Sequence, residues 1–293
     1  MDLISVIIPA FNAQSYVRQA VESALNQTYP DQEVIVVDDG STDGTPGILA
    51  EYAGRIRVVS QANQGTARAC NAGVHAARGT WIAFLDADDV WLAQKSQRQL
   101  AACGQYAISH TDSVCFGETI DGEIRRSSFE PPHAGKVLPE LLVRNFITKS
   151  AVMMLKSTFE ESGGFGDTHA AVEDWPLWLR ICARHELGYV PEVLLRYRVH
   201  RQSKSMRIRE TLGTHRRIIE EAFAADGVGA ALPHLRRRAL ASSYEINCHF
   251  ATEVGDFRFA RRCALGALVQ QPASVYAWKT MARTLLAPLR PAS

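Results

Sequence analysis

No run of apolar residues in this 293-residue chain approaches the ~20 residues that a membrane-spanning helix requires. The N-terminus, Met1-Asp2-Leu3-Ile4, has no basic segment ahead of its apolar residues, so we expect no signal peptide. Both absences argue against a membrane-spanning or secreted protein. We expect a cytoplasmic protein and leave open whether it attaches peripherally to the inner face of the membrane.

Two other patterns are missing from the sequence. The six cysteines are scattered and form no Cys-x-x-Cys pair, which favours reduced thiols over a disulfide framework. No segment interleaves basic and aromatic residues, so we expect no nucleic-acid partner. With 46% hydrophobic and 22% charged residues, the composition is ordinary for a soluble protein.

The small net charge of +1 hides an uneven distribution along the chain. Residues 1–200 contain 17 Lys and Arg against 24 Asp and Glu, whereas residues 201–293 contain 15 against 7. This change predicts a domain boundary near residue 200. Three interpretations of the basic part are open: it faces an anionic membrane surface, it docks on the acidic part, or it is an ordinary solvated surface.

Three carboxylates follow an apolar segment within the acidic part. Residues 81–85 are apolar at consecutive positions, as in a strand buried on both faces, and Asp86, Asp88 and Asp89 come next. Carboxylates so close together repel one another unless a cation neutralises them. Oxygen ligands suit Mg²⁺ or Mn²⁺, which usually also bind a substrate phosphate. The alternative is an acidic helix start that uses one aspartate as its cap.

The first hundred residues alternate strands with helices. We expect strands near 3–9, 34–37, 57–60 and 81–85, separated by helices near 13–26, 42–53 and 66–77. This alternation predicts a layered α/β domain in which parallel strands bring their carboxyl ends to one edge. The acids of Asp38-Asp39-Gly40 would then share a crevice with Asp86 to Asp89. A plain turn followed by an N-cap is the alternative for Asp38-Asp39-Gly40.

Five segments, taken in order, resemble the family 2 glycosyltransferases. They are SVIIPAFN at 5–12, VVDDGSTD at 36–43, NQG at 63–65, NAG at 71–73 and FLDADD at 84–89. The resemblance extends to about residue 205 and implies the GT-A fold, a Rossmann-like mixed sheet flanked by helices. It also implies inverting transfer of a sugar from a nucleotide diphosphate donor, with UDP as the default nucleotide.

The same resemblance implies roles for single residues. Pro9, Ala10, Asn12, Asp39, Asn71 and Asp86 would bind the donor, with Asp39 at the base and Asp86 near the ribose. Asp88 would hold the divalent cation, Mn²⁺ or Mg²⁺. Many relatives carry arginine where this chain has Cys70. Arg68 does not simply replace it, because two helical residues turn the side chain by about 200°.

Residues 1–100 would form the nucleotide-sugar-binding part of the catalytic domain and residues 101–205 its acceptor-binding part. Asp121-Gly122 predicts a hairpin, and residues 146–155 a further strand. Glu173 and Asp174 stand just before Pro176, which suits a helix start. By themselves they are capping acids beside tryptophans. The resemblance instead makes Asp174 the catalytic base and Glu173 its partner in a Glu-Asp pair.

A single histidine is usually structural or solvated, but His200 ends a Tyr-Arg-x-His segment similar to that of the family. This implies that His200 contacts the metal or the diphosphate. Inversion by single displacement needs a base and a stabilised leaving group, so no cysteine or serine receives a catalytic role. The sequence has no Gln-x-x-Arg-Trp segment, which argues against a processive polysaccharide synthase.

Residues 206–293 predict a basic helical extension, with amphipathic stretches at 235–250, 257–269 and 275–286. A protein partner, a second copy of the chain and a membrane face are all open as contacts of these helices. The resemblance implies a saccharide or lipid-linked acceptor and a setting in bacterial polysaccharide biosynthesis.

Two other functions compete with sugar transfer. Residues 86–90, DADDV, also fit the haloacid-dehalogenase-like phosphatases, in which Asp86 would be phosphorylated and Asp88 would act as general acid. In those enzymes the motif follows the first strand, whereas here three predicted strands precede it. A catalytically silent scaffold that works through its helical extension is the third candidate. The position of the motif favours the transferase.

Overall fold

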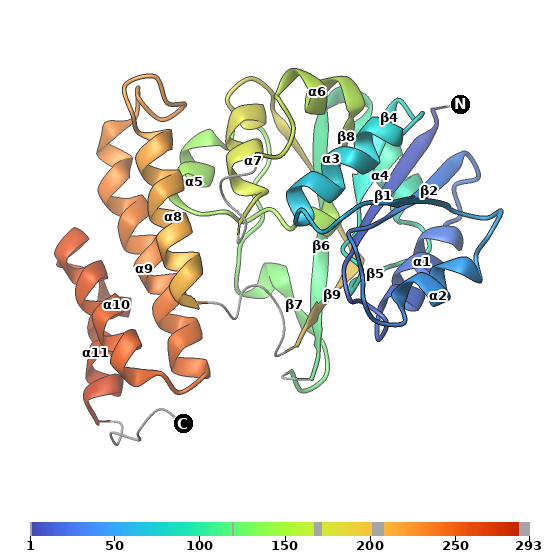
Figure 1. The fold of residues 1–293 in the computed structure, drawn as a ribbon. Coiled ribbons are helices and arrows are strands. Elements are labelled where there is room, and N and C mark those ends of the chain that lie inside the picture. The colour runs from blue at the N-terminus through green and yellow to red at the C-terminus, as the bar shows by residue number, and fades with distance from the viewer. Residues whose placement is uncertain (1, 119, 167–171, 201–207, 287–293) are drawn as a thin grey trace. The chain divides into compact units, whose positions relative to one another are not determined.

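The computed structural model describes residues 2–118, 120–166, 172–200 and 208–286. The chain divides into two compact units (Figure 1). The first comprises Met1–Val137 and Phe146–Arg201, and the second comprises Leu138–Asn145 and Gln202–Ser293. The expected boundary between residues 205 and 206 lies outside the described residues. The functional division at residue 100 stays a prediction.

A nine-stranded mixed sheet forms the centre of the first unit. Its order is β3-β2-β1-β4-β8-β6-β9-β5, and β7 pairs with β6. The first four strands are parallel, β8 is antiparallel to both β4 and β6, and β9 runs parallel to β6. The strands are β1 (Ile4–Ala10), β2 (Gln32–Asp38), β3 (Arg57–Ser60), β4 (Trp81–Phe84), β5 (Val90–Trp91), β6 (Ile108–Gly117), β7 (Ile124–Arg125), β8 (Met153–Leu155) and β9 (Leu187–Val199).

Helices connect these strands and cover the sheet. They are α1 (Val17–Leu25), α2 (Thr45–Ala50), α3 (Thr66–Ala76), α4 (Lys95–Ala102), α6 (Lys156–Glu161) and α7 (Trp175–Cys182), with 3-10 turns η1 (Cys103–Gln105), η2 (Arg126–Ser128) and η3 (Lys149–Ala151). The fold is therefore the mixed α/β architecture expected from the sequence.

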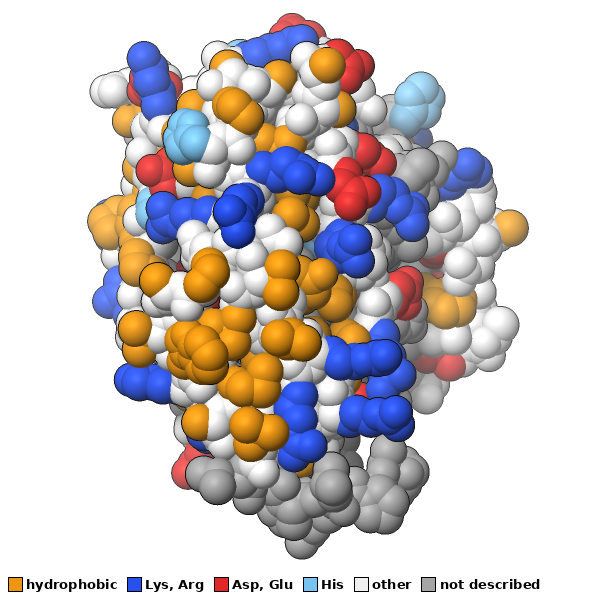
Figure 2. Space-filling model, turned by 90° about the vertical axis from the view of Figure 1, so that its left-hand side faces the viewer, with side chains coloured by type: hydrophobic (Ala, Val, Ile, Leu, Met, Phe, Trp, Pro, Cys, Tyr) orange, Lys and Arg blue, Asp and Glu red, His pale blue; other side chains and the backbone are white. Residues whose placement is uncertain are grey.

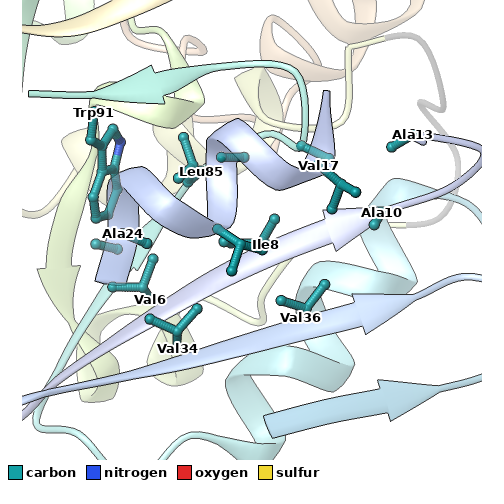
Figure 3. Packing of buried hydrophobic residues seen from close by; sticks show 14 of the residues in the cluster. Val6, Ile8, Ala10, Ala13, Val17, Ala24, Val34, Val36, Leu85 and Trp91 are labelled. Atoms are coloured by element: carbon teal, nitrogen blue, oxygen red, sulfur yellow. The ribbon is translucent and has the colours of Figure 1, made fainter. Parts of the chain in front are cut away.

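Apolar side chains of β1, β2 and α1 form the core beneath the site. Val17, Ala20, Val21 and Ala24 are buried at the spacing of one helix face, so α1 lies flat on the sheet. Figure 3 shows Val6 and Ile8 of β1 next to Val34 and Val36 of β2 in this cluster. Because every residue of β1 is buried, the strand is fixed on both faces and its carboxyl end is held rigidly.

Most of the expected elements are confirmed, with one error. The strand expected at 57–60 is β3, and the hairpin at Asp121-Gly122 joins β6 to β7. The strand expected at 146–155 is wrong, since only Met153–Leu155 is a strand. Ser150 turns the chain aside, because its hydroxyl accepts a hydrogen bond from the Asp86 amide at 3.0 Å and its carbonyl accepts one from the Trp91 indole at 2.8 Å.

The second unit is helical. It contains α5 (Leu138–Val143), α8 (Ile208–Ala222), η5 (Pro233–Leu235), α9 (Arg236–Glu253), α10 (Phe257–Gln270) and α11 (Val275–Leu286). The three amphipathic stretches expected in this region are confirmed as α9, α10 and α11. Small buried residues such as Ala251, Ala260 and Ala264 let α9 and α10 approach closely. Within the described residues, no helix combines the length and the apolarity needed to cross a membrane.

Candidate active site

The carboxyl ends of β1, β2 and β4 meet at one edge of the sheet. Strand register places Ala10 opposite Asp38 and Ile7 opposite Phe84, and Leu85 continues this pairing through a hydrogen bond to the Ile7 carbonyl at 3.0 Å. Asp86 therefore follows β4 at the edge where β1 and β2 also end. This is the crevice at which open α/β sheets bind ligands.

The segment after β1 has a fixed shape. Pro9 and Ala10 are buried in the strand, while Asn12 adopts a positive φ of 48°, which asparagine tolerates better than most residues. The Asn12 side-chain oxygen accepts a hydrogen bond from the Thr42 backbone nitrogen at 2.8 Å, and the Asn12 backbone nitrogen donates to the Ser41 hydroxyl at 3.0 Å. These bonds tie the loops after β1 and β2 together. A donor-binding role for Pro9, Ala10 and Asn12 stays a prediction.

Asp39 organises the loop that leads into α3. Its buried carboxylate accepts hydrogen bonds from the Gln61 side chain at 2.7 Å and from the backbone nitrogens of Gln64 and Gly65 at 2.9 and 2.8 Å. A carboxylate offers about four acceptor positions, and three of those of Asp39 serve this loop. The structure thus gives Asp39 a loop-building task besides its predicted contact with the base.

Asn71 also has a structural task. Its side-chain amide donates to the Phe165 carbonyl at 2.8 Å and accepts from the Phe165 nitrogen at 3.0 Å. The adjoining Gly164 has a positive φ of 63°, and a Cβ there would lie 3.0 Å from the Asn71 side-chain oxygen. Asn71 therefore holds this glycine-rich loop against α3, and its donor-binding role stays a prediction.

Asp88 and Asp89, which follow β4, have different environments. Asp89 is buried; one oxygen accepts from the Arg198 nitrogen at 2.8 Å, and the other makes no hydrogen bond in the described part of the chain. Burial, together with the charges of Asp88 and Asp86, raises the pKa of Asp89 well above its usual value. Asp88 is about a third exposed, and its carboxylate lies 2.9 Å from the His200 ring nitrogen Nε2. A site of this kind is poised to accept a cation.

The donor set fits a divalent cation that a substrate completes. Asp88 and His200 offer one carboxylate and one imidazole at hydrogen-bond distance from each other. Among the residues that the structure describes, no three His, Cys, Asp or Glu side chains form a ready-made metal cluster. Mg²⁺ and Mn²⁺ sites in phosphate chemistry commonly use one or two carboxylates and fill the remaining positions with phosphate oxygens and water.

Two basic residues belong to this site: Arg198 is the arginine of the Tyr-Arg-x-His segment, whereas Lys149 stands in none of the sequence motifs. The Arg198 guanidinium donates to the Asp88 carbonyl at 2.7 Å and stacks on Tyr16 and Phe116, at 4.9 and 4.4 Å from the ring centroids. The Lys149 ammonium is buried between Asp86 and Glu173. Cys70 lies close enough to Lys149 to contribute to its pKa, whereas Arg68 donates to the Gln64 side chain. For Lys149, the only sign in the sequence was a lysine among mainly apolar residues at 146–152.

Glu173 and Asp174 stand at the start of α7, as expected. The aspartate is the N-cap residue but makes no side-chain capping bond; instead its carboxylate accepts from the Trp178 indole at 3.3 Å. Trp178 packs on Phe165, which packs on Phe84 of β4, with ring centroids 5.9 and 5.2 Å apart. This aromatic row sets α7 against the strand that carries the acids. Asp174 thus occupies the capping position of α7 without making the capping hydrogen bond, and its catalytic role stays a prediction.

Comparison with known proteins places this geometry in context. A family model described as "Glycosyl transferase family 2" matches residues 5–162. An "Uncharacterized glycosyltransferase" of Rickettsia felis is 28% identical over 216 residues, which cover 70% of this chain and 36% of that protein. The chain thus spans little more than a third of the length of that relative.

Solved structures share the fold. S. aureus TarS 1-349, in complex with UDP-GlcNAc, superposes with a TM-score of 0.64 at 17% identity, covering 97% of this chain and 89% of TarS 1-349. A mannosyltransferase from Pyrobaculum calidifontis, in complex with GDP-Man and Mn²⁺, gives a TM-score of 0.58 at 20% identity, covering 96% and 84%. Both structures contain a nucleotide sugar, and the mixed sheet with its C-terminal helices is similar to theirs.

Proposed function

Because this chain belongs to glycosyltransferase family 2, we propose that it moves a sugar from a UDP-sugar to a saccharide or lipid-linked acceptor, with inversion at the anomeric carbon. The observation that carries this proposal is that two pairs of acidic residues, from distant parts of the chain, lie close together. Asp86 and Asp88 follow β4, Glu173 and Asp174 precede α7, and Lys149 joins the two sets. A transferase needs such an arrangement, with one set for the donor diphosphate and one for the acceptor hydroxyl.

In the proposed reaction, Asp174 takes the proton from the acceptor hydroxyl as that oxygen attacks the anomeric carbon. Its carboxylate is half-buried and accepts a long hydrogen bond from the Trp178 indole, which holds its direction. Asp88 and His200 would hold a divalent cation, which would supply Lewis-acid stabilisation of the leaving diphosphate. Asp86 and Asp39 orient the ribose and the base. No covalent enzyme intermediate is required.

The phosphatase alternative does not hold for this chain. The acids follow β4, and β1, β2 and β3 precede that strand in the chain and lie on one side of it in the sheet. The family match covers the same segment and assigns it to sugar transfer. The protein is therefore an enzyme of the transferase class and not a phosphorylated-aspartate phosphatase.

A panel of nucleotide sugars tests the donor assignment. At concentrations about 100-fold above Kd, a UDP-sugar is expected to raise the melting temperature by roughly 5 °C or more when Mn²⁺ is present, because ligands that bind only the folded state stabilise it by mass action. The measurement compares UDP-, GDP- and dTDP-sugars with Mn²⁺ and with EDTA. If no nucleotide sugar in the panel raises the melting temperature, the proposed donor is wrong.

The second unit carries a surface suited to an anionic membrane, and this is the contact we propose for it. Arg209, Arg258 and Arg262 surround a hollow of ≈ 220 Å³ beside the Phe259 ring. Arg258 and Arg262 share one face of α10 with the exposed Leu265 and Val269. Figure 2 shows apolar side chains gathered beside Lys and Arg on the face that carries α10 and α11. Basic residues beside exposed apolar ones fit a headgroup phosphate and the acyl chains beneath it.

Vesicle binding tests this contact. The protein is expected to sediment with vesicles that contain phosphatidylglycerol and not with phosphatidylcholine alone. The double variant Arg258→Glu/Arg262→Glu should weaken that binding at least about tenfold, since each basic residue near an anionic surface contributes about 1 kcal/mol. Arg184→Glu, an exposed site on the first unit, is the control. Equal binding to both vesicle types, or dimerisation in solution without vesicle binding, would contradict the proposal.

A further inference from the structure

A buried lysine joins the two halves of the candidate active site. The Lys149 ammonium lies 2.9 Å from the Asp86 carboxylate and 3.0 Å from the Glu173 carboxylate. The side chains of Lys149 and Glu173 are each 7% exposed, so water contributes little to holding these charges. An ion pair this dry persists only where its geometry is enforced.

The fold enforces that geometry from three directions. Strand β8 runs antiparallel to β4, with Met153 opposite Ala83, which carries the preceding turn η3 back alongside the end of β4. Ser150, next to the lysine, binds the Asp86 nitrogen at 3.0 Å. The row Trp178, Phe165 and Phe84 sets α7, and with it Glu173, against the same strand. The backbone at Lys149 is thus held in place, and the ammonium contacts a carboxylate on each side.

Resting on the proposed sugar transfer, we propose that Lys149 is a positioning residue that fixes Glu173, and through it the adjoining base Asp174, relative to the donor-binding end of β4. Misplacing reacting groups by about 1 Å costs roughly 100-fold in rate. A single cation between Asp86 and Glu173 prevents that displacement, because without it the two carboxylates would repel each other.

The charges around Lys149 agree with this role. Burial alone would lower the pKa of Lys149, but the carboxylates of Asp86 and Glu173 raise it well above its usual value, so the ammonium stays charged at all working pH values. A permanently charged lysine donates hydrogen bonds and does not serve as a proton acceptor. Its contribution is therefore to placement and not to proton transfer.

Kinetics and donor binding of three variants test the proposal. Lys149→Met keeps the length of the side chain and removes its charge; we expect kcat for the turnover of an accepted UDP-sugar to fall by about 100-fold. The affinity for UDP with Mn²⁺, measured calorimetrically, should be unchanged or tighter, because a positive charge near the cation site is lost. Lys149→Arg should recover at least tenfold of the lost kcat. Lys156→Met is the control, since that lysine donates to the Ala77 carbonyl away from the site.

Two kinetic outcomes would overturn the proposal. If Lys149→Met keeps kcat within about threefold of the unchanged enzyme, the lysine does not position the base. If UDP affinity and kcat fall in parallel, Lys149 acts on the donor and not on the Glu-Asp pair.

A thermal double-mutant cycle separates failure of this proposal from failure of the proposed function, because it requires no turnover. Lys149→Met should lower the melting temperature by roughly 10 °C, since it leaves the buried Glu173 carboxylate without its cation. In the double variant Lys149→Met/Glu173→Gln the decrease in melting temperature should be clearly smaller than the sum of the decreases in the two single variants. Additive losses would show that the two residues are not coupled, and the bridge would then be wrong whatever reaction the protein catalyses.

Discussion

Replacing Asp174 with asparagine is expected to reduce sugar transfer by about 10²- to 10⁴-fold, the range that a general base usually contributes. The amide keeps the oxygen that accepts the Trp178 indole at 3.3 Å, so the start of α7 should be undisturbed. Only the capacity to take a proton from the acceptor hydroxyl is lost. The Glu-Asp pair lies on the acceptor side of the proposed reaction, and so donor binding should survive.

The measurement is UDP release from the donor that stabilises the protein most in the nucleotide-sugar panel, followed alongside calorimetric binding of UDP and Mn²⁺. Asp121→Asn, in the exposed hairpin turn between β6 and β7, is a chemically matched control that should keep full activity. If Asp174→Asn turns over every donor at the original rate, Asp174 is not the base.

Replacing Asp88 with asparagine should cost at least about 100-fold in transfer and should remove the Mn²⁺ dependence of donor binding. Removing a single group that stabilises developing negative charge typically costs 10²- to 10³-fold. Asp88 is about a third exposed, and its carboxylate already faces His200 at 2.9 Å. An amide has no charge to neutralise a divalent cation, whereas its size leaves the fold unchanged.

Calorimetric titration of Mn²⁺ into the UDP-saturated protein checks this expectation. EDTA should reproduce the effect in the unchanged enzyme and should have little further effect on Asp88→Asn. A variant that binds Mn²⁺ as tightly as the original protein would remove Asp88 from the metal site, and the cation would have to be sought at other ligands.

Local patterns predicted those parts of the site that depend on neighbouring residues. The apolar run ending at Asp86 and the turn at Asp38-Asp39-Gly40 could be read directly, because strand burial and turn chemistry act within a few residues. Parallel register then brought both strand ends to one edge, as the α/β alternation predicted.

The contacts that join distant segments were not predictable in the same way. Lys149 reaches Asp86 only because β8 runs antiparallel to β4, and nothing in the apolar stretch 146–155 shows where its strand begins. Asp39 and Asn71 matched binding motifs, yet the structure also uses their side chains to hold the Gln64 and Phe165 backbones. A motif names a residue type at a position and does not say how many partners that residue serves.

Strand β9 has a consequence for the order in which this protein becomes active. Its residue Arg198 binds Asp89, which lies 109 residues earlier in the sequence. The strand then leads to His200, which contacts Asp88, 112 residues earlier. Pairing over such separations is slow, because the intervening chain must be closed into a loop first. A ribosome making this protein therefore releases β1 to β4, with their acids, well before the strand that brings Arg198 and His200 to them. If Asp88 and His200 hold a cation as proposed, the nascent chain cannot transfer a sugar until about residue 200 has emerged and paired.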